Sequence, residues 1–308
     1  MEAPHPIEET IAGLASEGAL VNARLAELAS LSRDDLRVLR AAWPGIAAER
    51  RRQTIQRLVE LTEDNFELNF DDIFRLAIKD TDPAVRARAI EGLWENEAPS
   101  LIDPLVGMLE NDDSTEVQGA AATALGKYAL LAEHGKLRPQ YGPRLMASLL
   151  KVFSDRSRPE DVRRRTLEAV APFSDPAVKD AIGEAFRNGT PRLRVSALFA
   201  MGRSCDLDWL PILLHELDSK DAEVRYEAVS ALGELGEPEA VASLIRLSAD
   251  PDTEVRLASF QAMGKIGGPK AKEFLRYSLG SKDPAIRDAA RHALDELRAT
   301  EDPLSLQL

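Results

Sequence analysis

The chain has 308 residues, of which 44% are hydrophobic and 30% are charged, so it can bury a sizeable core and is not disordered as a whole. Its 39 basic and 52 acidic residues leave a formal charge of −13, which argues against general binding to a nucleic-acid backbone. A single cysteine excludes both a disulfide within the chain and a zinc site built from cysteines. No apolar run approaches the ~18 residues of a membrane-spanning helix and no secretory signal is visible, so we expect a soluble cytoplasmic protein without a membrane partner.

Residues 1–71 are predicted to be helical but to follow the repeat described below only weakly. A degenerate copy of it is indicated at Arg50–Leu58, where Ile55 falls at the position of Ile90 in the next copy. We expect this region to cap the stack by covering the apolar face of the first repeat. The predicted helices span residues 7–17, 19–29, 33–43 and 46–62.

From residue 72 onward one motif recurs along the chain, written DTDPAVRARAIEGL in its first copy. The copies share an aliphatic anchor residue, and the steps between successive anchors are 32, 45, 31, 31, 31 and 31 residues. Self-similarity at such a period indicates stacked units of supersecondary structure. The anchors are Val85, Val117, Val162, Leu193, Val224, Val255 and Ile286.

Each copy is predicted to contain two helices, A and then B. Helix B begins after an oxygen-bearing side chain that can cap it, often followed by proline, as at Asp82-Pro83. Both helices carry an apolar stripe, and a helix pair cannot bury both stripes alone, so neighbouring pairs must stack. The sequence therefore predicts an all-α fold, an α-solenoid of about seven to eight helical-hairpin repeats over 72–298, with a frayed tail at 299–308.

The order helix A, short turn, D-x-x-V-R, helix B resembles the HEAT-repeat family, in the short form found in phycobilin-lyase-like proteins. The resemblance covers residues 72–298. It implies that the B helices line a concave surface and that the Asp and Arg of the motif form a ladder between adjacent repeats. A repeat of this kind is specific for the fold and says little about function.

The Asp and Arg of the motif are assigned to structure rather than to catalysis. Arg follows the anchor in six of the seven copies, with Gln118 as the exception, and in four copies Asp lies three residues before the anchor. This spacing predicts an i,i+4 ion pair across the first turn of helix B. The Asp is also favoured by the helix dipole.

The 45-residue step contains an insertion at about 127–144. We expect a longer B helix and then a loop carrying His134, Pro139, Tyr141 and Pro143. A loop that contacts a partner and a tolerated surface insertion are both compatible with this pattern.

Catalytic motifs are absent from the sequence. None of the four histidines (His5, His134, His215 and His292) lies in a zinc signature, and there is no glycine-rich phosphate loop and no G-x-S-x-G elbow. The neighbours of Cys205 include Asp206 and Asp208, which should disfavour a reactive thiolate, so we expect a structural cysteine. We predict no catalytic residue, no metal site and no cofactor.

Two enzymatic relatives of such repeats need consideration. Deoxyhypusine hydroxylase holds two irons with His-Glu pairs repeated over several units, whereas His215-Glu216 is the only such pair here. A lyase-like activity on a chromophore or a modified protein is harder to exclude, because that family lacks a sharp catalytic motif. Nucleic-acid binding through local Arg clusters, at Arg50–Arg52 with Arg57 and at Arg156–Arg165, is a further alternative.

If the apolar stripe of helix B faces the core, the residues two, six and nine positions after the anchor point outward. Four apolar residues then gather over three consecutive repeats, with Arg164 and Glu168 on one flank and Asp288 and His292 on the other. An apolar centre with a charged rim is typical of a site for a protein or peptide, so we expect a non-enzymatic scaffold or adaptor. Packing of these side chains between adjacent B helices is the competing interpretation. The four residues are Val195, Phe199, Tyr226 and Leu257.

Overall fold

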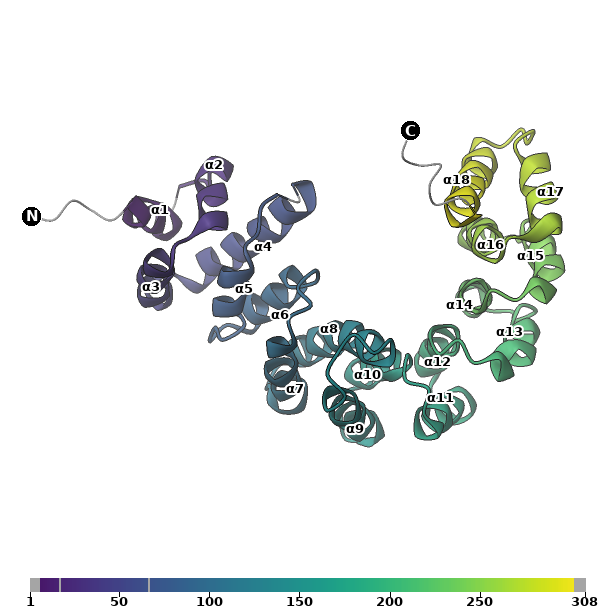
Figure 1. The fold of residues 1–308 in the computed structure, drawn as a ribbon, viewed down its shortest axis with the longest axis horizontal. Coiled ribbons are helices and arrows are strands. Elements are labelled where there is room, and N and C mark those ends of the chain that lie inside the picture. The colour runs from purple at the N-terminus through teal and green to yellow at the C-terminus, as the bar shows by residue number, and fades with distance from the viewer. Residues whose placement is uncertain (1–5, 17, 66, 302–308) are drawn as a thin grey trace, which may run out of the picture. The chain divides into compact units, whose positions relative to one another are not determined.

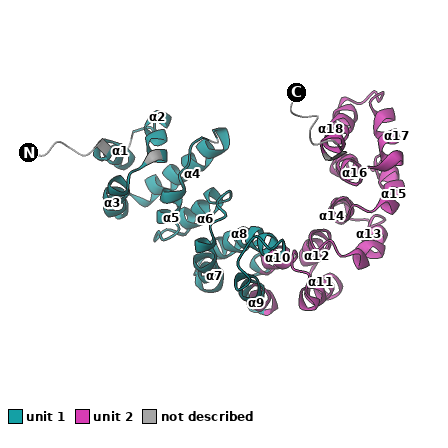
Figure 2. Ribbon diagram, viewed as in Figure 1, with its two compact units in different colours: residues 1–148, 155–162 teal, residues 149–154, 163–308 magenta. Residues whose placement is uncertain are grey.

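The computed structural model describes residues 6–16, 18–65 and 67–301, which form α-helices and short 3-10 helices and contain no strand (Figure 1). These helices confirm the all-α solenoid. The chain divides into two compact units, unit 1 with Met1–Ser148 and Asp155–Val162, and unit 2 with Leu149–Ser154 and Arg163–Leu308 (Figure 2). No helix in the described part of the chain is both long enough and apolar enough to span a membrane.

Unit 1 holds the N-terminal helices and the first two hairpins, α5 with α6 and α7 with α8. Helices α9 and α10 each have residues in both units. The bounds of these helices are α1 Pro6–Ala15, α2 Asn22–Ala26, α3 Arg33–Ala42, α4 Ala48–Asp64, α5 Asp71–Ala77, α6 Pro83–Gly92, α7 Ile102–Asn111, α8 Thr115–Glu133, α9 Tyr141–Ser154 and α10 Glu160–Val170.

Unit 2 continues with four hairpins, in which each A helix packs against the B helix that follows it. The B helices α12, α14, α16 and α18 also pack against one another in sequence, and they lie on the inner side of this unit in Figure 1. The bounds are α11 Pro176–Asn188, α12 Pro191–Arg203, α13 Leu210–Glu216, α14 Ala222–Leu235, α15 Val241–Leu247, α16 Thr253–Ile266, α17 Gly268–Ser278 and α18 Pro284–Glu301.

The B helices begin and bury their anchors as the motif predicts. The carboxylate of Asp82 accepts hydrogen bonds from the backbone N–H groups of Ala84 and Val85, and Pro83 occupies the first helical position. Six of the seven anchor residues are buried, and Ile286 of the last hairpin is partly exposed. The periodic aliphatic positions therefore build the core of the stack.

Helix α4 takes the place of a B helix ahead of the first complete hairpin. It packs against α6, and Ile55 and Leu58 on it are fully buried. This packing accounts for the degenerate copy of the motif at Arg50–Leu58. That the helices before α4 serve as a cap remains a proposal.

The Arg of the motif bridges to the next repeat. Arg86 of α6 donates hydrogen bonds of 2.9 and 2.8 Å to Asp112, and Arg225 of α14 donates two of 2.8 Å to Asp250. Both carboxylates lie in the turn that precedes the B helix of the following hairpin. A ladder between adjacent repeats is thus present at these pairs, but its acceptors lie five residues before the anchors Val117 and Val255 and are not the motif Asp three residues before the anchor.

The ion pair expected within the first turn of helix B is not formed, and that prediction is wrong. Asp252 uses its carboxylate to cap α16, accepting from the N–H groups of Glu254 and Val255 at 2.9 and 3.1 Å. Arg256 turns toward the preceding loop and donates to the carbonyl oxygen of Asp250 at 2.8 Å. Capping satisfies backbone N–H groups that would otherwise lack a partner, so it competes for the carboxylate.

The insertion at about 127–144 begins inside α8, whose 19 residues make it the longest described helix. Tyr128 Oη and Lys127 Nζ both donate to the carbonyl oxygen of Asn96, each at 2.7 Å. The first residues of the insertion are therefore hydrogen-bonded to the loop between α6 and α7. The loop that follows α8 is exposed at His134 and Pro139, whereas Tyr141 and Pro143, which were expected in this loop, lie in the first turn of α9. A partner contact at the loop stays a proposal.

Candidate surface on the inner face of unit 2

Two aromatic side chains are exposed on adjacent B helices of unit 2. Phe199 of α12 is 40% exposed and Tyr226 of α14 is 36% exposed. Leu257 of α16 is partly exposed at the position equivalent to Tyr226. Of the residues expected to form an apolar patch, these three contribute surface, and we call them the inner patch.

Val195, the fourth expected member, is buried with 6% of its surface exposed, which corrects the expectation that it lines the surface. It lies seven residues before Gly202 and so on the same face of α12. A Cβ atom at Gly202 would be 2.7 Å from the Cα of Ala231, so α12 and α14 come very close at this face.

The glycines nine residues after the anchors are likewise buried rather than directed outward. Gly202, Gly233 and Gly264 each face an alanine on the next B helix. The exposed position is the one after them, where Glu234 of α14 pairs with Lys265 of α16 at 2.6 Å and with Arg203 of α12 at 4.0 Å. Sequence reasoning missed this row of alternating charges, although the 31-residue step relates its members.

Arg164 and Glu168 of α10 form the polar flank of the inner patch. Arg164 Nε donates to the Ser196 hydroxyl at 2.9 Å, and that hydroxyl donates to Glu168 Oε1 at 2.6 Å. Glu168 also accepts from Arg165 Nη1 at 3.0 Å. These contacts place Arg164 and Glu168 beside Ser196, only three residues before Phe199 on α12.

Glu227 is a feature that the motif does not predict. It lies three residues after the anchor Val224, where the next B helices carry Ala258 and Ala289 and the preceding one carries Ser196. The pKa of Glu227 is raised to about 7, mainly by burial of its carboxyl group. The carboxylates of Glu168 and Glu223 raise this pKa further, and Arg164 lowers it. None of the described residues donates a hydrogen bond to this carboxylate.

Glu227→Gln is expected to stabilise the protein at about pH 8 by about 1–3 kcal/mol and to change little at about pH 4.5. Between its ordinary value of 4.5 and about 7, the folded protein keeps a proton that the unfolded chain has lost, so stability falls as pH rises through this range. Urea unfolding at the two pH values measures the difference. Glu234→Gln is the control, because the carboxylate of Glu234 is already paired. An equal gain in the free energy of unfolding for Glu227→Gln at both pH values would contradict the raised pKa of Glu227.

The region around Cys205 forms a hollow of about 390 Å³ that Phe173, Lys179 and Trp209 help to line. Cys205 is exposed and has a φ of 50°, so it belongs to a tight turn rather than to the core. Lys179 pairs with Asp206 at 2.6 Å and also with Asp208. The ammonium group of Lys179 and the carboxylates of Asp206 and Asp208 therefore pair with one another at this hollow.

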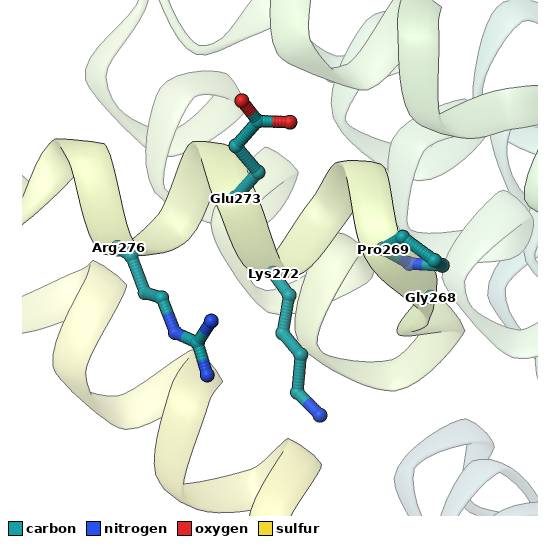
Figure 3. Close-up of a pocket in the computed structure, with 5 residues that line it drawn as sticks. All are labelled: Gly268, Pro269, Lys272, Glu273 and Arg276. Carbon is teal, nitrogen blue, oxygen red and sulfur yellow. The ribbon is translucent and has the colours of Figure 1, made fainter.

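A second hollow, of about 450 Å³, lies along α17 (Figure 3). Lys272 and Arg276 are directed to one side of the helix and Glu273 to the other (Figure 3). Gly268 and Pro269 complete the lining. The hollow is an open surface of a single helix, without converging groups that could carry out a reaction.

The Arg clusters that suggested nucleic-acid binding are largely engaged in structural contacts. In the first cluster, Arg51 pairs with Asp80 and Arg52 with Asp82. In the second, Arg158 donates to the carbonyl oxygen of Glu110 at 2.8 Å, and Arg163 donates to that of Phe153 at 2.9 Å. These four arginines therefore bind groups of the protein itself, which argues against their binding a nucleic-acid backbone.

Metal-binding groups do not converge in the described part of the chain. His134, His215 and His292 are all exposed, and no three His, Cys, Asp or Glu side chains there lie close enough to hold an ion. Glu216 of the single His-Glu pair is bound by Arg194 at 2.8 Å. His5 lies outside the described residues.

Comparison with known proteins gives a family match. A model of HEAT repeats matches residues 71–151 and 210–295. Deoxyhypusine hydroxylase of Gallus gallus is 35% identical over 100 residues, which cover 32% of this chain and 33% of that protein. The chain thus spans about a third of the length of this relative.

Solved structures share the arrangement of helices. The complex of CpcE and CpcF of phycocyanin lyase from Nostoc sp. PCC7120 has a TM-score of 0.51 and 18% identity, covering 77% of this chain and 94% of that one. Human deoxyhypusine hydroxylase in complex with glycerol has a TM-score of 0.33 and 20% identity, covering 95% and 96%. At these identities the first likeness supports the fold alone, and the second is too low to carry an argument.

Proposed function

This chain belongs to the HEAT-repeat family, and we propose that it is a non-enzymatic scaffold or adaptor that binds a partner protein or peptide on the inner face of unit 2. In such a solenoid each repeat adds surface to one continuous face, so function depends on the side chains displayed there. We expect this binding to need no cofactor.

The observation that carries the proposal is the exposure of Phe199 and Tyr226 on adjacent helices. Aromatic side chains contribute large contact areas and are enriched among the residues that dominate binding energy. Arg164 and Glu168 contact Ser196, three residues before Phe199, and Glu234 lies eight residues after Tyr226 on the same helix. An apolar centre within a charged rim is the usual anatomy of a protein interface.

The double substitution Phe199→Glu with Tyr226→Glu tests this proposal. We expect binding to fall at least about tenfold, because each aromatic anchor is worth on the order of 1–2 kcal/mol or more. Partners retained by the wild type from a lysate of the source cell are identified by mass spectrometry, and their affinity for both forms is then measured.

Tyr277→Glu is the matched control, since this tyrosine is exposed on α17, an A helix. A helical circular-dichroism spectrum identical to that of the wild type excludes misfolding. Equal binding by the double variant and the wild type would place the binding site elsewhere.

An enzymatic role is the second candidate, favoured by the stretch that is 35% identical to deoxyhypusine hydroxylase. Against a di-iron centre of that kind stands the single His-Glu pair, whose Glu216 already pairs with Arg194. A lyase-like action on a chromophore or modified protein belongs to the same class of alternative. Metal content and the visible absorption spectrum of the purified protein test both, because either bound iron or bound colour would favour an enzyme.

A further inference from the structure

We propose that the segment bound on the inner face of unit 2 carries a lysine or arginine beside apolar side chains, with the cation at Glu227 and the apolar groups on the inner patch. This inference rests on the proposed function and specifies the chemistry of the partner. It starts from a carboxylate that the repeat does not need and the fold does not pair.

The position of Glu227 is the first step. On α12 and α16 the equivalent residues are Ser196 and Ala258, which are buried beside the preceding B helix. Small side chains suit such a contact, whereas a half-buried carboxylate without a cation destabilises it. Local departures from the rules of a fold that bring no structural gain are expected at functional positions.

The electrostatic surroundings of Glu227 are the second step. Glu168 and Glu223 both act on it as like charges, and Arg164 is the cation that acts against them. Arg164 is already hydrogen-bonded to Ser196. On the neighbouring helices, Arg194 pairs with Glu216 and Arg256 donates to the turn before α16, so both are directed elsewhere. Glu168 is itself paired with Arg165, so the excess of negative charge at this site comes from Glu223 and from the ionised form of Glu227.

A cationic side chain fits this excess better than a metal ion does. The acidic groups here are not close enough together for an ion to bind three of them, as found for all described residues. Lys and Arg have long apolar stems that can cross the aromatic patch while the charge reaches a carboxylate.

The net charge of −13 also favours a partner segment that carries basic residues. An acidic protein attracts basic segments over longer distances and disfavours acidic ones, which speeds association and sharpens selectivity. Apolar contact on Phe199 and Tyr226 then supplies most of the binding energy, and the ion pair at Glu227 selects the register.

Selection of random short peptides from a display library, with the full chain as bait, tests the inference. We expect the selected peptides to be enriched in Lys or Arg next to Leu, Ile, Phe or Met. With Glu227→Gln as bait, the enrichment in Lys and Arg should disappear while the apolar preference remains. A selected peptide should bind this variant about tenfold more weakly, the loss of about 1.4 kcal/mol expected for one charge-assisted hydrogen bond.

Glu234→Gln is the matched control, because it removes the same charge from the same helix at a carboxylate already paired with Lys265. Its selected peptides should keep their basic residues. Peptides that depend on Phe199 but show no basic enrichment, or an enrichment that Glu227→Gln leaves intact, would overturn this inference and leave the proposed function standing. If no peptide is selected, or if selection is unaffected by Phe199→Glu, the proposed function fails and the inference fails with it.

Discussion

Asp80→Ala is expected to lower the free energy of unfolding of unit 1 by about 3–5 kcal/mol, as is typical when one partner of a buried ion pair is removed. Asp80 accepts hydrogen bonds from Arg51 Nε at 2.8 Å, Arg51 Nη2 at 2.9 Å, Trp43 Nε1 at 2.6 Å and the Asp82 N–H at 2.8 Å. Because Arg51 and Trp43 are both buried, water cannot replace these bonds.

This network joins α4 to the turn that precedes α6, so its loss should loosen the first interface of the stack. Urea unfolding measures the change in stability, and hydrogen exchange in α4 and α6 locates it. Glu91→Ala is the control, because Glu91 pairs with Arg88 in an exposed contact and should cost less than about 0.5 kcal/mol. Similar losses for the two variants would show that the buried network contributes no more than a surface pair.

The same network has a pH signature. Burial alone would raise the pKa of Asp80, but hydrogen bonds from Arg51, from the Asp82 backbone and from Trp43 outweigh it and hold the pKa below its ordinary value. The stabilisation is therefore present above the ordinary value of 3.8 and is lost as pH falls through the lower pKa of the folded state. Asp80→Ala should accordingly flatten the acid limb of the stability profile.

The fold could be predicted because the same sequence signals recur in each repeat. Anchors at a constant step, a capping residue before each B helix and apolar stripes on both helices all indicate one architecture, and stacked repeats contact only their neighbours. Even the weak copy at Arg50–Leu58 corresponds to a helix that packs as a B helix does. These features depend on residues close together in the sequence.

The inner surface was harder to predict because it depends on how closely adjacent helices pack. The helical wheel gives Val195 and Tyr226 the same direction, yet Val195 is covered and Tyr226 is exposed. Each lies seven residues before a glycine that closely approaches the next B helix, Gly202 and Gly233, so neither the periodicity within one helix nor this contact separates the two positions. Glu227 was missed for a related reason, since only the buried Ser196 and Ala258 reveal that its position lies between helices.

Gly202→Ala is expected to destabilise unit 2 by about 2–3 kcal/mol, although alanine is the better helix former by about 1 kcal/mol. The added Cβ atom would lie 2.7 Å from Cα and 2.9 Å from Cβ of Ala231. One atom belongs to the backbone and the other is the Cβ of an alanine, so neither can rotate away, and the helices must separate at this buried contact.

Gly107→Ala provides a control of opposite sign. Gly107 is exposed within α7, and a Cβ atom there would meet nothing within 4 Å, so the substitution should stabilise by about 0.5–1 kcal/mol. Gly233→Ala should fall between the two, because its Cβ atom would lie 3.0 Å from Ala262, a contact that a small shift can relieve. Unfolding in urea ranks the three variants. If Gly202→Ala were as stabilising as Gly107→Ala, the close approach of α12 and α14 at Gly202 would not hold in solution.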